Sequence, residues 1–164
     1  MDLLKENRSG LIVIDVQEKL AKAVTNPKKT EKSIITLIKG FQLFKRPVVC
    51  TEQYPEGLGT TIPSVKALLE DIKIIEKTSF SCCGKPEFTA GLLRKHVLQA
   101  VVCGLEAHIC VWQTAVELQE AGIEPIVVRE AVSSRNSSDI EVALKQFAAA
   151  GIRVVSAEMI LFEI

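Results

Sequence analysis

The chain has 164 residues, and its 20 Lys and Arg balance 20 Asp and Glu, so the formal net charge at pH 7 is zero. This length is typical of one domain that buries roughly two-thirds of its unfolded surface, and we treat residues 1–164 as a single domain. A neutral chain without a basic run argues against nucleic acid, or an anionic membrane surface, as the main partner.

The N-terminal residues are charged and carry no apolar signal-peptide core, and no apolar run reaches the length of a membrane span. The five cysteines are odd in number and show neither C-x-x-C spacing nor a nearby histidine pair. We therefore expect a cytoplasmic protein with free thiols, no metal site and no cofactor. Cys82 and Cys83 are adjacent, which disfavours an ordinary disulfide between them and places them in a loop.

The first half of the chain alternates strands and helices. Residues 10–15 form an aliphatic run that ends on Asp15, whose carboxylate must either emerge at the sheet edge or be paired. Apolar residues at i, i+3, i+4 and i+7 from Ile34 to Phe41 predict an amphipathic helix. Residues 47–51 predict a second strand, and residues 52–61 a loop long enough to be functional. Gly57 and Gly59 in it lack the third glycine of a phosphate-binding loop.

The pattern continues to the middle of the chain. The sequence predicts a short helix at residues 63–70, a strand at 72–77 that ends on Lys77, a loop at 78–86, a helix at 88–96 and a buried strand at 97–103.

A thiol stands where the next helix begins. Gly104 ends the strand, and a helical pattern runs from residue 111 to a glycine stop at Gly122. Cys110 therefore lies at the N-terminus of a helix, where unpaired backbone N–H groups and the helix dipole favour a thiolate. This placement makes Cys110 a candidate nucleophile; the alternative is that it serves as a small buried apolar residue.

The last third repeats a unit. Gly122 and Gly151 are about 30 residues apart, the length of a βαβ unit, and each precedes a short aliphatic strand. Strands and helices thus alternate throughout the chain. The predicted fold is doubly wound α/β, with a parallel sheet of about six strands and helices on both faces.

Three chemically active side chains meet at the carboxyl edge of this sheet. The usual strand order 3-2-1-4-5-6 places Asp15 and Cys110 side by side, and Lys77 can reach across on its long stem. A thiol attacking as thiolate needs a proton acceptor, and a lysine stabilises the charges that form. Each residue alone has a structural interpretation, Asp15 as a turn cap and Lys77 as a solvated strand end. His108, two residues before Cys110, should point elsewhere and take no part.

The chain resembles the isochorismatase-like cysteine hydrolases along essentially its whole length. The resemblance rests on the motifs LIVIDVQ at residues 11–17, TEQYPEGLG at 51–59, EKTSFS at 76–81, GLEAHICV at 104–111 and AVSSR at 131–135. It implies a three-layer sandwich and an Asp15–Lys77–Cys110 catalytic triad. It also implies a cis peptide between Leu105 and Glu106, with the backbone N–H groups of Glu106 and Cys110 forming an oxyanion hole.

Two differences from the sequence motifs of the family disfavour two of its known activities. Metal-dependent nicotinamidases of the family carry an Asp-x-His motif where this chain reads TEQY at residues 51–54, which disfavours a metal-dependent nicotinamidase. The branch that cleaves the isochorismate vinyl ether lacks the nucleophilic cysteine, which is present here as Cys110. The chain is most similar to the small, metal-free members of the family.

The expected function is hydrolysis of a small amide-type C–N bond through an acyl intermediate on Cys110. Asp15 would be the base and Lys77 would stabilise charge. The alternative is a non-catalytic binding or assembly module of the same fold, and a flavodoxin-like nucleotide binder is a distant third. The family also tends to form homo-oligomers. The expected walls of the substrate pocket are Gln17, Gln53, Tyr54, Phe80 and Leu105.

Overall fold

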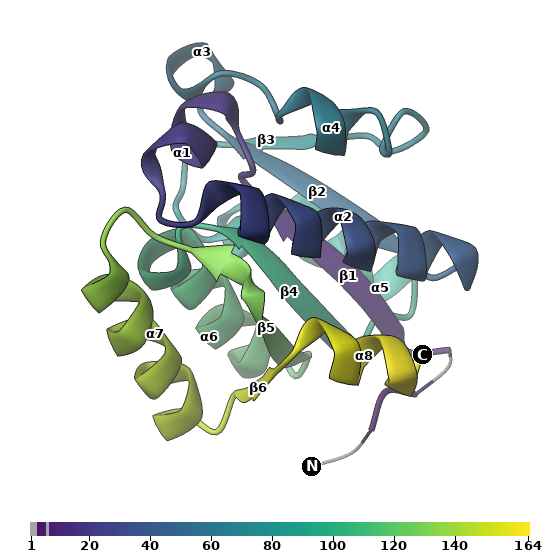
Figure 1. The fold of residues 1–164 in the computed structure, drawn as a ribbon. Coiled ribbons are helices and arrows are strands. Elements are labelled where there is room, and N and C mark those ends of the chain that lie inside the picture. Colours follow the sequence, from purple (N-terminus) through teal and green to yellow (C-terminus); the bar gives the residue numbers. More distant parts are fainter. Residues whose placement is uncertain (1–2, 6) are drawn as a thin grey trace.

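The computed structural model describes residues 3–5 and 7–164 and contains one six-stranded parallel sheet in the order β3-β2-β1-β4-β5-β6 (Figure 1). This is the predicted strand order. The strands are β1 (Ser9–Ile14), β2 (Val48–Gln53), β3 (Ile75–Lys77), β4 (Gln99–Leu105), β5 (Glu124–Ser133) and β6 (Arg153–Val155).

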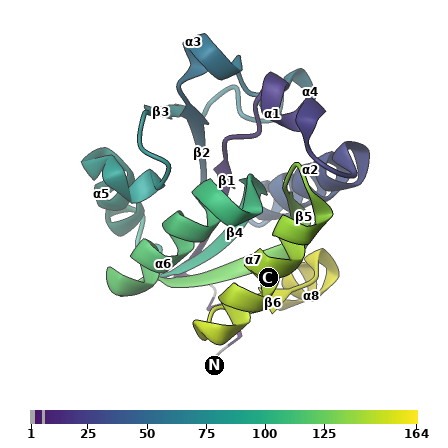
Figure 2. The same ribbon diagram turned by 90° about the vertical axis from the view of Figure 1, so that its left-hand side faces the viewer.

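Helices cover both faces of the sheet, so the predicted three-layer sandwich is confirmed (Figure 2). They are α1 (Glu18–Ala23), α2 (Pro27–Leu43), α3 (Pro55–Leu58), α4 (Pro63–Lys66), α5 (Pro86–Arg94), α6 (Trp112–Glu120), α7 (Ser137–Ala149) and α8 (Ala157–Glu163), with a 3₁₀ turn at Cys82–Gly84 and a π-helical turn at Ala107–Val111. Among the residues described, no helix is long and apolar enough to cross a membrane.

Successive side chains of the central strands point to opposite faces of the sheet, so the hydrophobic core consists of two clusters, one on each face. Ile12 and Ile14 of β1 pack with α5, α6 and α7, whereas Leu11 and Val13 pack with α2, α4 and α8. All six residues of β1 and all seven of β4 are buried, as expected for strands with helices on both faces. The predicted stripe from Ile34 to Phe41 is the buried face of α2.

Short helices account for most differences from the prediction. The expected loop at 52–61 contains the single turn α3, which begins at Pro55, a favoured first residue of a helix. Helix α1 has no buried residue, so it left no apolar period to detect. Helix α8, capped by the Ser156 hydroxyl, was also missed. The strand predicted at 72–77 is formed only at Ile75–Lys77.

Strand order reverses between β1 and β4, and in sheets of this kind ligands bind at such a switch point. Gly104 makes the close approach of these two strands possible at their carboxyl ends. It pairs with Ile14, has a φ of 124°, and a Cβ there would lie 2.0 Å from the Ile14 carbonyl oxygen. A β-bulge between Val102 and Gly104 shifts the register against β5. Gly104, opposite Ile14, is the last residue of β4 that pairs with β1, and the chain leaves this pairing toward Cys110.

We expect Gly104→Ala to destabilise the fold by at least ~3 kcal/mol, because backbone atoms cannot move away from the new methyl group. Gly91→Ala is the control, since a Cβ in this helix would approach only the end of Arg94, at 3.8 Å. It should be neutral or stabilise by ~0.5–1 kcal/mol. Urea unfolding followed by circular dichroism measures both, and equal effects would contradict the assignment.

Candidate active site

Asp15 stands directly after β1 and turns the chain with a φ of 50°, a conformation in which Asp is among the better tolerated residues. Its side chain is fully buried, and both carboxylate oxygens have partners. Lys77 Nζ donates to Oδ2 at 2.6 Å, and Thr51 Oγ1 donates to Oδ1 at 2.7 Å. The paired alternative of the sequence analysis is therefore the one observed.

Lys77 reaches this carboxylate from the end of β3, the edge strand beyond β2. Besides Asp15, its ammonium group lies 2.8 Å from Gln53 Oε1, 3.1 Å from the Ser79 carbonyl and 2.9 Å from the Phe80 carbonyl. These oxygens replace the water that a buried ammonium has lost, which allows the ion pair to persist in the interior. Lys77 is a buried ion-pair partner rather than a solvated strand end.

Cys110 lies on the π-helical turn between β4 and α6, and its thiol is within hydrogen-bonding reach of Asp15. The residue is only 5% exposed. Burial raises the pKa of the Cys110 thiol to about 12, and the negative charge of Asp15 adds to this, while Lys77 opposes it. We expected the helix N-terminus to favour a thiolate. The resting form is instead the protonated thiol, because the desolvation of Cys110 raises its pKa by more than the helix dipole lowers it.

Burial also raises the pKa of Asp15, while the charge and hydrogen bond of Lys77, and the hydrogen bonds from Thr51 and Cys110, oppose the shift. A carboxylate with a raised pKa is the better proton acceptor. The structure thus brings together a protonated thiol, a carboxylate of increased basicity and a buried cation. This set can transfer a proton from Cys110 to Asp15 when an electrophile arrives.

The turn that carries Cys110 begins with a cis peptide between Leu105 and Glu106, as the family resemblance implies. The Val111 N–H donates to the Glu106 carbonyl at 3.2 Å, and the Trp112 N–H donates to the Ala107 carbonyl, which are the wide spacings of a π-helix. His108 points to Ser134 Oγ at 2.8 Å, consistent with the expectation that it faces away from the thiol.

The residues expected to form the pocket occupy three different places. Gln17 is fully buried, and its amide binds the backbone of Gln53 and Gly59, so it fixes the loop after β2. Gln53 holds Lys77 through Oε1. The side chains of Tyr54 and Phe80 are 53% and 55% exposed beside this network.

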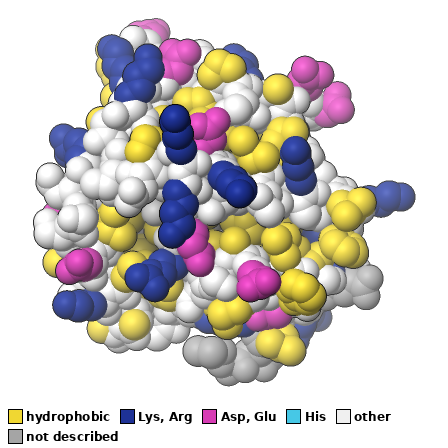
Figure 3. Space-filling model, in the orientation of Figure 1, with side chains coloured by type: hydrophobic (Ala, Val, Ile, Leu, Met, Phe, Trp, Pro, Cys, Tyr) yellow, Lys and Arg dark blue, Asp and Glu magenta, His cyan; other side chains and the backbone are white. Residues whose placement is uncertain are grey.

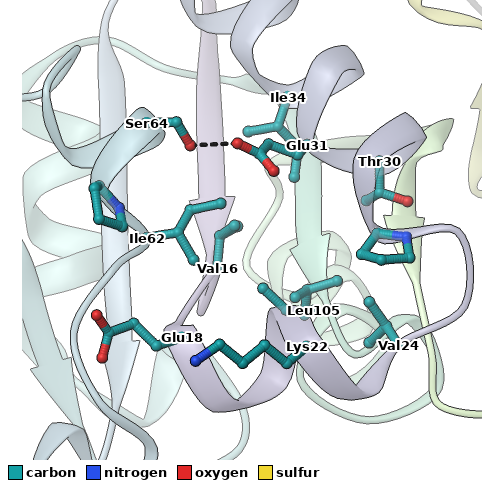
Figure 4. A pocket seen from close by; sticks show the side chains of 13 residues that line it. Val16, Glu18, Lys22, Val24, Thr30, Glu31, Ile34, Ile62, Ser64 and Leu105 are labelled. Atoms are coloured by element: carbon teal, nitrogen blue, oxygen red, sulfur yellow. Dashed lines mark hydrogen bonds between the residues drawn. The ribbon is translucent and has the colours of Figure 1, made fainter.

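Leu105 instead lines a cavity of about 570 Å³ between α1, α2 and the segment that leads into α4. Val16, Ile62 and Leu105 form its apolar floor, and a hydrogen bond from Ser64 to Glu31 spans one end (Figure 4). Val16 packs in the cluster on the α2 side of the sheet, whereas Cys110 packs in the cluster on the other side. Leu105 is thus placed away from the thiol.

Thr51 is the site residue that the sequence analysis missed. Its hydroxyl donates to Asp15 and also lies 3.6 Å from Cys82 Sγ, so Cys82, in the predicted connection between β3 and α5, is buried beside the triad. A threonine near the end of a strand is common, and the motif at residues 51–59, which begins with Thr51, assigned this side chain no role. Only the pairing of β1 with β2, which sets Thr51 beside Ile14, shows its role.

The position of the family's metal motif is occupied by a different network. Glu52 Oε1 accepts hydrogen bonds from the backbone N–H and the hydroxyl of Thr61, at 2.6 and 2.7 Å. The carboxylate thus fixes the loop that contains α3. Across residues 3–5 and 7–164 there is no group of three or more His, Cys, Asp or Glu placed to hold a metal ion.

The buried ion pair between Asp15 and Lys77 predicts how substitutions change the free energy of unfolding. Lys77→Met should cost ~3–5 kcal/mol, because it leaves the Asp15 carboxylate buried without its counter-charge. Adding Asp15→Asn to that variant should recover part of the loss, since the remaining group is neutral. Urea unfolding of both variants at pH 7 measures the difference, and a double variant no more stable than Lys77→Met would contradict the pairing.

Comparison with known proteins identifies the family of this chain. The family model of the isochorismatase domain matches residues 9–159. Isochorismatase domain-containing protein 2 from Danio rerio is 32% identical over 161 residues, covering 98% of this chain and 81% of that protein. A solved structure of a protein named MAR1 ribonuclease from Caenorhabditis elegans is 36% identical, with a TM-score of 0.92 over 99% of this chain and 83% of the other.

Two more distant structures share the fold. The YcaC gene product of Escherichia coli, described as an octameric hydrolase of unknown specificity, is 21% identical with a TM-score of 0.93, covering 99% of this chain and 81% of the other. The nicotinamidase/pyrazinamidase PncA of Bacillus subtilis is 22% identical with a TM-score of 0.81, covering 91% of this chain and all of the other. With the family model matched across nearly its whole length, the chain belongs to the isochorismatase family, whose hydrolase fold it has.

Proposed function

We propose that the protein is a cysteine hydrolase that cleaves a small-molecule amide-type C–N bond. The observation that carries the proposal is the Asp15 carboxylate, which is hydrogen-bonded to Lys77 on one side and within reach of the Cys110 thiol on the other. The hydrolase fold is common to the family. The amide class is supported by the thiol that the vinyl-ether branch lacks, and by the nicotinamidase among the structural neighbours.

The reaction begins with transfer of the thiol proton from Cys110 to Asp15 as the sulfur attacks the carbonyl carbon. The C–N bond then breaks, the leaving amine takes the proton from Asp15, and a thioester remains on Cys110. Water adds to the thioester with Asp15 again accepting a proton, and the thiol is regenerated as the acid leaves. Lys77 keeps its charge throughout and stabilises the carboxylate and the forming thiolate.

The negative oxygen of the tetrahedral intermediate needs fixed N–H donors. We assign this role to the backbone N–H groups of Glu106 and Cys110, at the start of the turn that leads into α6. The support is their position, since the Leu105–Glu106 cis peptide follows Gly104, which pairs with Ile14 just before Asp15. Tyr54 and Phe80, exposed aromatic residues next to the Lys77 network, are the proposed contacts for the substrate.

A homo-oligomer is part of the proposal. Apolar side chains gather over α8 and the C-terminal end of α2, two helices that pack together where Gly40 meets Leu161 (Figure 3). An exposed cluster of this kind is typical of a protein–protein contact. The octameric YcaC neighbour supports a contact between identical chains. The exposed residues are Leu43, Phe44, Met159 and Phe162.

The alternative is a non-catalytic binding module of the same fold. Two observations favour it: Cys110 is only 5% exposed, and the cavity of about 570 Å³ lies on the other face of the sheet. The two functions differ in what the loss of the thiol does. A binding module keeps its ligand affinity without the Cys110 sulfur, whereas the hydrolase loses turnover.

We expect Cys110→Ala to abolish hydrolysis, a fall in kcat of at least ~10³-fold, while thermal stability stays within ~1.5 kcal/mol of the wild type. The assay is release of amine or ammonia from a panel of small primary and aryl amides. Cys83→Ala is the matched control, because this partly exposed thiol lies outside the triad. Residual activity near the wild-type level in Cys110→Ala would contradict the mechanism.

The raised pKa of Cys110 predicts a pH profile. Alkylation of Cys110 by iodoacetamide should rise with pH and show its midpoint above the ordinary cysteine value of ~8.5. Asp15→Asn removes the negative charge that raises this pKa, so it should move the Cys110 profile to lower pH while hydrolysis is lost. Peptide mass spectrometry follows each cysteine separately. A shift of the Asp15→Asn profile to higher pH would contradict the assigned charge of Asp15.

A further inference from the structure

The turn that carries Cys110 is joined to the segment after β5 by two side-chain contacts that the chemical steps do not use. His108 Nδ1 lies 2.8 Å from Ser134 Oγ. Glu106 Oε2 accepts hydrogen bonds from the backbone N–H and the Nε of Arg135, at 2.9 and 3.1 Å. Two residues just before Cys110 are thus bound to two consecutive residues of another element.

The segment after β5 is itself held in place. The Ser134 carbonyl accepts a hydrogen bond from the Thr25 N–H at 2.9 Å, and Ser133 Oγ donates to the Thr25 carbonyl at 2.6 Å. Ser133 and Ser134 are both buried. Contacts from the Cys110 turn to this segment therefore fix the turn to the α1–α2 connection as well.

His108 has a polar neighbour near each ring nitrogen, and the shorter contact is the one to Ser134. Its Nε2 lies 3.9 Å from Asp139 Oδ2, and Asn136 Nδ2 donates to that same oxygen at 2.9 Å. The Ser134 hydroxyl can donate to a neutral ring or accept from a protonated one, so this contact exists in either charge state. Serine, histidine and aspartate stand here in the order of a nucleophilic triad, but Ser134 is fully buried and cannot meet a substrate.

We propose that His108 and the Glu106 side chain are positioning residues, which hold the backbone N–H groups of the Cys110 turn where an oxyanion forms. The proposal rests on the proposed hydrolase function and adds two side chains to it. A donor displaced by a fraction of an ångström loses most of its effect on a transition state. The five-residue π-helical turn joins β4 to α6, and these two side-chain contacts tie it to the segment after β5.

Two reactions of the Cys110 thiol distinguish the positioning of the oxyanion donors from the accessibility of the thiol to a reagent. With 4-nitrophenyl acetate, Cys110 Sγ bonds to the acetyl carbon, the bond to the 4-nitrophenolate oxygen breaks, and Asp15 takes the thiol proton. With iodoacetamide, Sγ bonds to the methylene carbon as iodide leaves, and no oxyanion forms. The ratio of the two rate constants at one pH therefore reports the oxyanion donors alone.

We expect the acylation-to-alkylation ratio to fall by about fivefold or more in Ser134→Ala and in His108→Phe, the factor that one hydrogen bond supplies. His108→Asn places an amide near the Nδ1 position and should restore much of the ratio, because it can still bond Ser134. Glu106→Ala and Glu106→Gln form a second pair with the same expected order. An unchanged ratio in both Ser134→Ala and His108→Phe would overturn the proposal.

His96→Asn is the control for loss of a histidine, since His96 is exposed at a φ of 55° that asparagine tolerates. If wild-type Cys110 accepts neither reagent, the hydrolase function fails, and hydrogen exchange of the backbone N–H groups of residues 107–111 then decides on the positioning role. Faster exchange in Ser134→Ala and His108→Phe, reversed in His108→Asn, supports that role. Exchange equal to the wild type overturns it.

Discussion

The burial of one carboxylate organises the carboxyl end of the sheet. Asp15 has lost all contact with water, so its charge must be balanced within the protein, and Lys77 supplies that balance from the edge strand β3. Lys77 in turn requires oxygens, which Gln53 and the carbonyls after β3 provide. The segments after β1, β2 and β3 are therefore arranged around one ion pair, and the thiol reaches the same carboxylate from the fourth segment.

A buried pair of this kind is costly to form, and its presence at a strand-order reversal is best explained by chemistry. A protonated thiol beside a carboxylate of raised pKa is stable at rest and becomes nucleophilic only when a proton moves. In the proposed mechanism, this arrangement keeps the thiol protonated until an electrophile is bound. The position of Cys110 at a helix N-terminus therefore did not predict its protonation state. Desolvation and the negative charge of Asp15 both disfavour the thiolate and oppose the helix dipole.

Sequence patterns predicted the architecture because the central strands and α2 bury continuous apolar faces. They also placed Asp15 and Cys110 after the ends of neighbouring strands, since strand order in doubly wound sheets is restricted. They did not find Thr51, whose contact with Asp15 depends on the register of β1 against β2. They also did not show that Leu105, the last residue of β4, lines the cavity beside α1 and α2, because a short motif contains too little information to show which way a side chain turns.

The proposed hydrolase mechanism requires a covalent intermediate at Cys110. An amide or ester donor that the protein turns over should be mixed with it, quenched with acid within milliseconds, and digested for peptide mass spectrometry. We predict the mass of the acyl group on the peptide that contains Cys110 in the wild type and its loss in Asp15→Asn. Turnover with no adduct on Cys110, or an equal adduct in Asp15→Asn, would contradict the claim that Asp15 activates this thiol.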